Sequence, residues 1–546
     1  MDFFKKNKNV LIFFSLLIVV IYGLTLWGDF VLDDGSLINF QYILSNPLKI
    51  KQIFMLPYWS VEAGLYRPVV VFSYSLNYFL LGTSPVGFHF INLILYVLTG
   101  FFIFKFLEKL FGDRFYALLT SFIFLILPIH TEAVANIIGR AEIMALLFSV
   151  LFLYEIIKEK PNAWLSGLYV FLAIGSKETA IAALPVAILV LYFKEKNNLR
   201  KLSDTIAVFN KYFYAILSAT TATTVYMMLR FSVLGSGHFL GVETSVVENP
   251  LMFANAMDRF STALSVMTMY IWKTFVPINL CSDYSYNQIP VTNFWHIQTL
   301  CGFVILLSAL VSIFYFLKKR PVISLATAIF LCSFLPVSNF IFPIGTIAGE
   351  RLMFFPSLGL VMIFALFLVE TYKHLGTNHR LNNEKLGQKF FLIVLAGLSV
   401  FYLVITITRA TDWLSEKRLF TSAAVCASHS VLSLSNMGTV YYFDGDYNLA
   451  EKELLAALAI NDSYSKGLNN LGLVYWKMGK IEKAKEYYLK AMQGQYPYPG
   501  AYENMALLYL SQNNIDMARE WLETFFSGNE QAVNEYLKNY GITSGQ

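Results

Sequence analysis

Charged side chains are scarce in this sequence. Asp, Glu, Lys and Arg make up 14% of the 546 residues, whereas hydrophobic residues make up 56% and aromatic residues 16%. An ordinary soluble domain has about 25% charged residues, so the composition excludes a single soluble domain of the usual kind. The formal net charge of +5 comes mostly from loop Lys and Arg, which indicate membrane orientation and not nucleic-acid binding.

Motifs for soluble nucleotide or metal chemistry are also missing. The sequence has no Gly-rich phosphate loop, no HExxH motif and no Cys/His cluster, so it does not support a soluble nucleotide or zinc mechanism. The four cysteines are scattered and show neither metal nor disulfide spacing: Cys281, Cys301, Cys332 and Cys426.

Long apolar runs are what the sequence has in abundance. The first extends from Val10 to Trp27 and follows Lys5, Lys6 and Lys8. It is long enough to cross about 30 Å of hydrocarbon. Because it has no small-residue cleavage site, we expect an uncleaved span with a cytoplasmic N-terminus.

Ten further stretches bring the expected number of spans to about eleven. They are 85–107, 115–129, 141–157, 163–175, 179–194, 207–229, 297–317, 322–341, 350–371 and 389–408. The apolar stretch 262–280 is doubtful as a span. The distribution of basic residues therefore decides the expected topology.

Basic clusters between the spans are expected on the cytoplasmic side. They are Lys105/Lys109/Arg114, Lys158/Lys160, Lys194/Lys196/Arg200/Lys201, Lys318/Lys319/Arg320 and Lys373/Arg380/Lys385/Lys389. All of them can be cytoplasmic only if 262–280 does not cross fully. The number of crossings is then odd, and the segments expected outside the cytoplasm are 28–84, 130–140, 230–296, 341–350 and everything after about 410.

The C-terminal part contains an internal repeat with a period of 34 residues. The aligned positions are Gly438/Gly472/Ala506, Tyr441/Tyr475/Tyr509 and Ala450/Ala484/Ala518. Small residues at two fixed positions let paired helices approach closely, which is typical of tetratricopeptide repeats. We expect about three repeats within 421–546, either binding extended peptides or proteins or serving only as a packing scaffold.

Ionisable residues gather beside the apolar spans on the predicted outer side. The five groups are Asp33/Asp34, Arg67, His130/Glu132/Arg140, Lys177/Glu178 and Glu350/Arg351. Such residues are costly near hydrocarbon and need partners or a function. Any one group could be an interfacial side chain that reaches water, but five groups on one side favour a function.

Acids and cations together suit the transfer of a sugar from a lipid phosphate. A carboxylate can take the proton of an attacking protein hydroxyl, and Lys or Arg can neutralise the departing phosphate. Adjacent acids such as Asp33 and Asp34 could instead bind Mg²⁺ or Mn²⁺. Both possibilities remain open on the residues alone.

Several stretches resemble the transmembrane and tetratricopeptide-repeat O-mannosyltransferases of the glycosyltransferase C superfamily. They are FVLDDGSLI, YRPVVVFSYSLNYFLLGTSPVGFHFINLILY, LPIHTEAVANIIGRAEIMALLF, SKETAI, FVPINLCSDYS, FLPVSNFIFPIGTIAGERLMFFPSLG and ATDWLSEKRLFTSA, in that order. They cover roughly residues 28–420. The resemblance implies an all-α fold, with a membrane domain of about eleven spans in 1–420 and extracytoplasmic repeats in 421–546.

The resemblance also implies an activity and its partners. These are a polyprenyl- or dolichyl-phosphate sugar donor in the membrane lipid, transfer to Ser or Thr of an exported protein with inversion, and usually no required metal. About three repeats are fewer than the long arrays of the animal members, which leaves the acceptor class open. Composition favours a prokaryotic cytoplasmic membrane, and the endoplasmic reticulum would be its eukaryotic counterpart.

Roles for individual residues follow from the same resemblance. Asp33 and Asp34 take the catalytic role, with Asp34 favoured as base and Asp33 as helper. Lys177 and Arg351 would bind the donor phosphate, and Arg140 is a further phosphate-binding or structural candidate. The expected pocket residues are His130, Glu132, Glu178, Arg67, Glu350 and Asp283.

Two other functions compete with protein glycosylation. One is transfer of sugar to a lipid or glycan, and the other is a non-catalytic scaffold that recruits envelope proteins through the repeats. The scaffold predicts that Asp33 and Asp34 can be replaced by Asn without loss of function. A transporter is disfavoured because the sequence shows neither duplicated halves nor charges in the middle of its spans.

Overall fold

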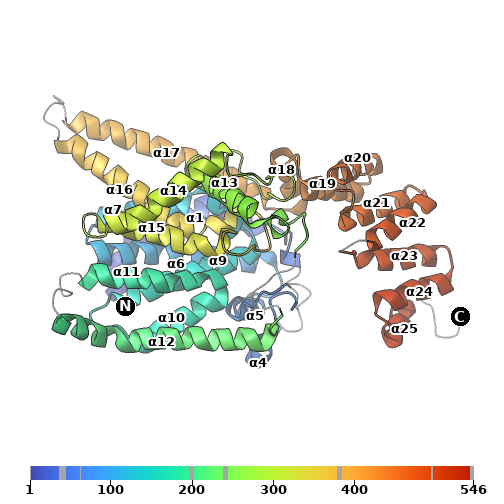
Figure 1. Cartoon of the computed structure of the whole chain (residues 1–546), viewed down its shortest axis with the longest axis horizontal. Coiled ribbons are helices and arrows are strands. Elements are labelled where there is room, and N and C mark those ends of the chain that lie inside the picture. The colour runs from blue at the N-terminus through green and yellow to red at the C-terminus, as the bar shows by residue number, and fades with distance from the viewer. Residues whose placement is uncertain are drawn as a thin grey trace. The chain divides into compact units, whose positions relative to one another are not determined.

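The computed structural model describes all of the chain except 1, 36–44, 62, 196–201, 238–243, 378–383, 494–495 and 541–546. Four of the basic residues used above therefore lie outside the described residues: Lys196, Arg200, Lys201 and Arg380. Every regular element in the described part is helical (Figure 1). The chain forms two compact units.

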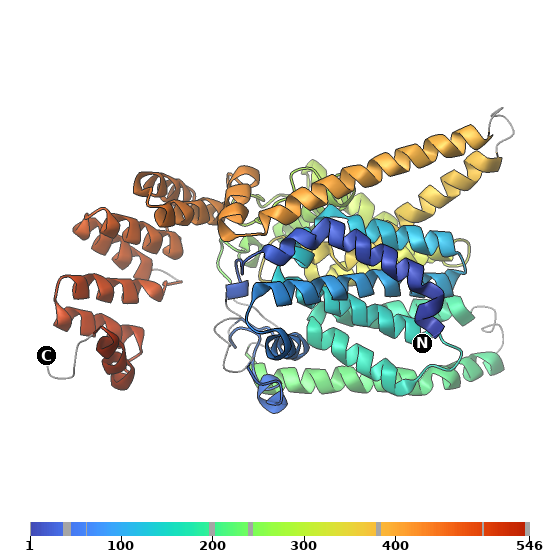
Figure 2. The ribbon, with the colours of Figure 1, turned by 180° about the vertical axis from the view of Figure 1, so that it is seen from behind.

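Unit 1 consists of residues 1–244, 251–282 and 291–419 and is built from long helices. Those that overlap the expected spans are α1 (Asp2–Tyr22), α6 (Pro85–Phe111), α7 (Arg114–Ile126), α9 (Arg140–Ile156), α10 (Ala163–Ser176), α11 (Ala183–Glu195), α12 (Leu202–Leu234), α14 (Ile297–Tyr315), α15 (Pro321–Phe334), α16 (Pro356–Thr377) and α17 (Glu384–Asp412). The overlap is partial for several of them, since the expected spans 179–194, 322–341 and 350–371 extend beyond α11, α15 and α16. Helices α5 (Pro68–Leu81) and α13 (Ala256–Phe275) of the same unit do not correspond to an expected span. Helix α6 contacts α1, α7 and α9, and the long helices run side by side (Figures 1 and 2).

Six helices in the described part are long and apolar enough to cross a membrane. They are Asn7–Trp27, Pro85–Phe111, Ile137–Ile156, Ile297–Tyr315, Pro356–Gly376 and Gly387–Asp412. A seventh span results if Arg114–Ile126 and Pro128–Ala135, which meet at a 56° bend, are counted together. The doubtful stretch 262–280 overlaps α13 (Ala256–Phe275), which is not among these described candidates.

Short helical elements connect the long helices at the ends where the polar groups gather. They are η1 (Gly23–Trp27), α4 (Ile50–Ile53), η2 (Pro128–His130), α8 (Thr131–Ala135), η3 (Ile137–Gly139), η4 (Glu178–Ala182), η5 (Pro250–Met252), η6 (Leu335–Val337) and η7 (Glu350–Met353). Pro128 disfavours helical backbone at the preceding Leu127, which is extended and ends α7. Gly139 lets η3 lie tightly against α8, since a Cβ there would be 2.2 Å from the Ala133 carbonyl oxygen.

Unit 2 consists of residues 245–250, 283–290 and 420–546 and contains the repeats. Their helix pairs are α19 (Val431–Asp444) with α20 (Tyr447–Ile460), α21 (Ser465–Lys477) with α22 (Ile481–Met492), and α23 (Gly500–Ser511) with α24 (Ile515–Phe525). Helix α18 (Glu416–Cys426) precedes them and α25 (Glu530–Asn539) follows. The predicted tetratricopeptide repeats are confirmed, and the small residues Ala450, Ala484 and Ala518 are all fully buried.

Two segments from earlier in the chain complete the first repeat. The Val431 N–H donates to the Tyr286 carbonyl oxygen over 2.7 Å, and the Tyr286 N–H donates to Val247 over 2.8 Å. Val247, Val431 and Ala457 also share a hydrophobic cluster. Nothing in the repeat pattern predicted this, because neither 245–250 nor 283–290 resembles a repeat.

The cysteine spacing was a poor guide to the disulfides. Cys281 and Cys426 are each disulfide-bonded, whereas Cys301 and Cys332 are free. Spacing along the chain misses such bonds because a disulfide requires only closeness in space. Disulfides persist in oxidising compartments, which agrees with the expectation that both bonded cysteines lie outside the cytoplasm.

The glycine of the second repeat makes a stability prediction. A Cβ on Gly472 would be 2.5 Å from the Tyr488 ring, whereas the third repeat places Ala506 in a cluster with Leu522 at the equivalent positions. We expect Gly472→Ala to lower the free energy of unfolding of unit 2 by about 1–3 kcal/mol through overpacking. The change is measured by thermal unfolding of the full chain, with unfolding of the repeats monitored by their proteolysis.

The matched control for this substitution is Gly472→Ala combined with Tyr488→Leu, which reproduces the pair of the third repeat. The two changes should be strongly non-additive, with Tyr488→Leu costing less beside Ala than beside Gly. Additive losses would contradict the close contact.

Candidate active site

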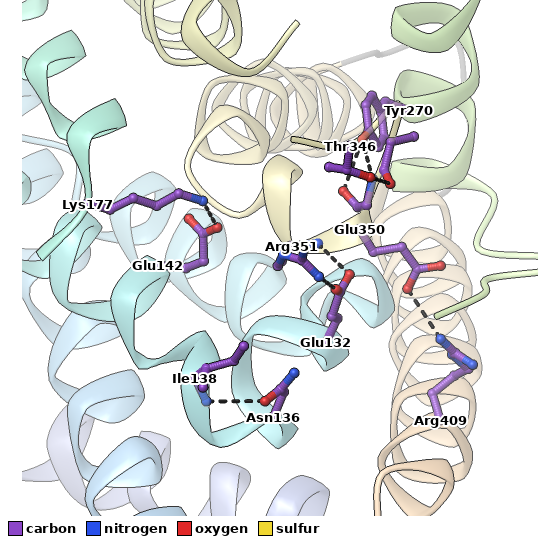
Figure 3. Close-up of polar contacts among 12 residues, drawn as sticks. Glu132, Asn136, Ile138, Glu142, Lys177, Tyr270, Thr346, Glu350, Arg351 and Arg409 are labelled. Carbon is purple, nitrogen blue, oxygen red and sulfur yellow. Dashed lines mark hydrogen bonds and ion pairs between the residues drawn. The ribbon is translucent and has the colours of Figure 1, made fainter. Parts of the chain in front are cut away.

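Residues 128–139, which form η2, α8 and η3, connect two groups of polar side chains in unit 1. Glu132 on α8 binds Arg351, and the backbone N–H groups at the start of η3 bind Asp34. Figure 3 shows Glu132 facing Arg351 and Asn136 capping η3 at the Ile138 N–H. This short segment therefore fixes an acidic loop and a cationic loop relative to one another.

The two adjacent acids of the first outer loop have different surroundings. Asp34 is fully buried, and its carboxylate accepts N–H groups from Val31 at 3.3 Å, Ile137 at 3.4 Å and Ile138 at 3.0 Å. Burial raises the pKa of Asp34 to about 7, although the three N–H groups oppose the rise. Asp33, by contrast, is exposed. One acid is buried and bound to the backbone, and the other is exposed.

Arg351 lies at the centre of the group of charges. Its backbone N–H donates to the Glu132 carboxylate over 2.9 Å, and its guanidinium forms an ion pair with the same buried group. The Glu132 carboxylate holds the pKa of Arg351 above its ordinary value, with smaller contributions from Asp33 and Glu142. Asp33 is therefore within electrostatic range of Arg351, whose side chain is 36% exposed.

A second ion pair joins Lys177 to Glu142. Both side chains are only 7% exposed, and Figure 3 shows the pair beside the Arg351–Glu132 pair. Burial lowers the pKa of Lys177, while Glu142 opposes the shift. Glu142 was not predicted, although an acid near the start of the apolar helix α9 was the signal available in the sequence.

Glu178 connects two arginines from different parts of unit 1. Its carboxylate pairs with Arg67 at 3.2 Å and with Arg230, at the end of α12, at 3.1 Å. It also accepts the backbone N–H of Tyr66 at 3.3 Å. The sequence indicated Arg67 and Glu178 but missed Arg230, which follows a predicted span.

The loop that holds Arg351 is bound on its other side as well. Glu350 is buried, accepts the Cys281 N–H and pairs with Arg409 of α17 at 3.4 Å. The Tyr270 hydroxyl accepts the Gly349 N–H at 2.7 Å and donates to its carbonyl oxygen at 3.0 Å. Figure 3 shows Glu350 directed toward Arg409 while Arg351 is directed toward Glu132.

His130 and Arg140 have the contacts of structural residues. The two ring nitrogens of buried His130 bond to the hydroxyl groups of Tyr96 at 3.1 Å and Ser357 at 2.7 Å. Buried Arg140 donates to the side chains of Asn92 at 2.7 Å and Asn77 at 2.8 Å, and further to Ser73 and Phe88. These bonds engage Nε and both terminal nitrogens, so Arg140 is not placed to bind a phosphate.

Asp283 belongs to the other unit. It accepts the backbone N–H of Ser285 at 2.9 Å and the hydroxyl of Ser430 at the start of the first repeat. Its contacts therefore support the repeats. Among the described residues, no three or more His, Cys, Asp or Glu are grouped to hold a metal ion.

The fold and the charged group define a class: a helical protein with several membrane-spanning candidates, an ionic cluster and C-terminal repeats. Family models of the tetratricopeptide repeat match residues 430–495 and 499–527. The chain is 28% identical over 477 residues to the protein O-mannosyl-transferase F38B6.6 of Caenorhabditis elegans, covering 84% of this chain and 64% of that protein.

Two mammalian proteins give similar alignments. Human protein O-mannosyl-transferase TMTC3 is 25% identical over 467 residues, 80% of this chain and 50% of that protein. Mouse TMTC4 is 26% identical over 455 residues, 73% of this chain and 59% of that protein. The chain is a distant homologue of the TMTC protein O-mannosyl-transferases, and it spans about half to two thirds of their length.

The buried pair of Lys177 and Glu142 makes a second prediction. Lys177→Met leaves the Glu142 carboxylate buried without its partner, so it should lower the free energy of unfolding by about 3–5 kcal/mol. Replacing both residues by Met should restore most of that loss. Thermal unfolding in lipid nanodiscs would measure both variants, and an unchanged midpoint for Lys177→Met would contradict the pairing.

Proposed function

We propose that this chain is a membrane glycosyltransferase that moves a sugar, with mannose expected, from a polyprenyl- or dolichyl-phosphate to Ser or Thr hydroxyls of exported proteins. The observation that carries the proposal is the exposed Asp33 carboxylate within electrostatic range of the partly exposed Arg351. A base and a phosphate-binding cation are the two groups that this reaction needs.

The reaction is an inverting displacement at the sugar. The base takes the proton of the acceptor hydroxyl as its oxygen attacks the anomeric carbon. The bond from that carbon to the phosphate oxygen breaks, and the lipid phosphate leaves with the electron pair. Because negative charge grows on the leaving phosphate, a nearby cation lowers the barrier.

Asp33 is the better candidate for the base, in contrast to the preference for Asp34 stated from the sequence. A general base must come within hydrogen-bond reach of the hydroxyl, and Asp33 is exposed while Asp34 is buried. Asp34 instead holds the loop through three backbone N–H groups. Its role in this proposal is to position Asp33.

Arg351 and Lys177 are the proposed donor-phosphate ligands. Arg351 is the more accessible of the two, and its guanidinium has five N–H groups, which Glu132 does not exhaust. Lys177 is more deeply buried and remains paired with Glu142. Arg67, paired with Glu178, is a further positive group of the proposed pocket.

The finer topology also belongs to this proposal. We infer a glycosyltransferase C domain of about eleven spans in 1–420, a cytoplasmic N-terminus and extracytoplasmic repeats in 421–546. The overlap of each expected span with a helix of unit 1 and the bonded cysteines support it. A lipid or glycan acceptor remains the second candidate, and the repeats favour a protein acceptor.

The base assignment predicts the effect of Asp33→Asn. Transfer from radiolabelled polyprenyl-phosphate-mannose by purified protein in lipid should fall by about 10²- to 10⁴-fold, because the hydroxyl loses its base. Asp29→Asn is the matched control, since Asp29 is exposed in the same loop, and it should retain activity. EDTA should leave the wild-type rate unchanged.

EDTA could instead abolish transfer, and Mg²⁺ or Mn²⁺ could restore it. That result would contradict the metal-free mechanism and favour a mechanism with a cation bound at Asp33 and Asp34. Equal activity of Asp33→Asn and wild type would contradict the base assignment and favour the scaffold. If transfer occurs only with other lipid-linked sugars, mannose is the wrong donor sugar and the proposed reaction otherwise stands.

The pKa of Asp34 predicts a pH dependence of its own. Below about pH 7 the carboxyl gains a proton and accepts the three N–H groups less well, so the transfer rate should fall as pH drops from 8 to 6. Asp34→Asn, neutral at every pH, should show the low rate throughout and lose this midpoint. A loss in Asp34→Asn as large as in Asp33→Asn would make Asp34 the base.

The free energy of unfolding should have the opposite pH dependence to the transfer rate, decreasing as the pH rises. A carboxyl whose folded pKa is raised from 3.8 to about 7 favours the fold when protonated, so its contribution is lost as pH rises through that window. As the pH is raised from 4 to 7, the thermal midpoint of wild type should therefore decrease relative to that of Asp34→Asn.

A further inference from the structure

Four lysines of unit 1 that do not belong to the cluster around Arg351 come together from four separate parts of the chain. Helix α9 contacts both α6 and α11, and the end of α11 lies on the same side of unit 1 as the start of α12 (Figure 1). The lysine group, as we call it, consists of Lys109 near the end of α6, Lys158 just after α9, Lys194 near the end of α11 and Lys211 in the first third of α12.

One tyrosine ring lies between two of these lysines. Lys109 Nζ is 5.3 Å and Lys158 Nζ is 5.7 Å from the centroid of the Tyr154 ring, within the distance at which an aromatic face attracts a cation. Lys194 Nζ donates to the Lys158 carbonyl oxygen over 2.8 Å. The third lysine is therefore bound directly to the backbone of the second.

A second tyrosine ring holds the other half of the group. Lys194 Nζ is 5.5 Å and Lys211 Nζ is 5.1 Å from the centroid of the Tyr212 ring. Beneath them, the buried Glu195 carboxylate pairs with Lys211 at 2.9 Å and accepts the Tyr212 hydroxyl. The ring and the acid are fixed by one another, so the positions of both lysines are defined.

The acids near the group leave two of its lysines without an ionic partner. Buried Glu155 pairs with Lys158, as Glu195 does with Lys211. Glu159 is exposed and forms no ion pair within the described part of the chain. In the same described part, no carboxylate lies within ion-pair distance of Lys109 or Lys194.

The lysines also act on one another electrostatically. Lys109 is within range of Lys158, and Lys194 is within range of both Lys109 and Lys211. Like charges at such separations repel, so an anion bound among them would be attracted by several cations at once. Lysine ammonium groups are common ligands of phosphate, which makes a phosphate group the anion that this arrangement fits.

The surroundings of the group indicate a lipid as the source of that phosphate. Lys109 is near the end of a helix, Pro85–Phe111, that is long and apolar enough to cross a membrane. Trp164 at the start of α10 is 73% exposed and Tyr214 on α12 is 70% exposed. Exposed Trp and Tyr are typical of the membrane–water interface, which is the level of the lipid headgroups.

We propose that the lysine group binds the phosphate of an anionic lipid headgroup, with Lys109 and Lys194 as its principal ligands. Basic pockets between the ends of membrane helices bind such headgroups. This site is separate from the proposed active site and does not rest on the proposed sugar transfer. The competing interpretation is that these lysines are solvated and contribute only to the general positive charge of their side of the membrane.

Native mass spectrometry of the purified full chain tests the proposal without any sugar donor. The protein in detergent is titrated with phosphatidylglycerol, which is anionic, or with phosphatidylcholine, which has no net charge. Wild type should bind its first phosphatidylglycerol about tenfold more tightly than phosphatidylcholine, because only the former brings an uncompensated phosphate to the lysines.

The double variant Lys109→Met/Lys194→Met should bind the first phosphatidylglycerol about twenty-five times more weakly, at roughly fivefold for each lysine. Lys109→Arg/Lys194→Arg keeps both charges and should bind within about threefold of wild type. The matched control is Lys318→Met/Lys319→Met, which removes the same charge from two exposed lysines between α14 and α15. It should bind within about twofold of wild type, because exposed charges far from a ligand are largely screened.

Thermal unfolding in nanodiscs separates loss of the site from loss of the fold. Neither Lys109 nor Lys194 forms an ion pair within the described residues, so Lys109→Met/Lys194→Met should unfold like wild type in pure phosphatidylcholine. Adding phosphatidylglycerol should raise the thermal midpoint of wild type and of the Lys318→Met/Lys319→Met control, but not that of Lys109→Met/Lys194→Met.

Three outcomes would overturn the proposal. Equal weakening in the two methionine double variants would show that phosphatidylglycerol responds only to the total charge. Equal affinity of wild type for the two lipids would show that the headgroup charge is not recognised. Displacement of phosphatidylglycerol by an equal concentration of soluble glycerol phosphate would show that the ligand is a free phosphate and not a lipid.

Discussion

The geometry of unit 1 depends on two acidic side chains held by one short stretch of backbone. Residues 131–139 present Glu132 to Arg351 and, five residues later, the N–H groups of Ile137 and Ile138 to Asp34. An acidic loop near the N-terminus and a cationic loop more than 300 residues away are therefore both bound to the same turn. Gly139 permits this turn because a side chain there would collide with Ala133.

Each cation of the cluster is already balanced by an acid in the same unit. Arg351 has Glu132, Lys177 has Glu142, and Arg67 and Arg230 share Glu178. Isolated ions so close to hydrocarbon would be costly, and pairing offsets much of that cost. This cluster of ion pairs therefore has no large excess of positive charge.

Several features of the fold and of the charged cluster could be predicted because they produce a recognisable pattern in the sequence. The apolar runs, the period of 34 and the polar groups on one side each follow a pattern that elementary physics explains. Glu142 and Arg230 were missed because the partner of each lies far away in the sequence. The different burial of Asp33 and Asp34 was invisible, since a loop has no period from which to assign an inward side.

The first repeat is completed by segments that are synthesised well before it. Tyr286 and Val247 are synthesised before Val431, to which Tyr286 bonds. At a synthesis rate of about 5–20 residues per second, the interval between them is on the order of ten seconds. During that time the Tyr286 carbonyl oxygen lacks the Val431 N–H that it accepts in the folded protein. Folding of unit 2 therefore requires residues 245–250 and 283–290 to stay accessible until the first repeat has been synthesised.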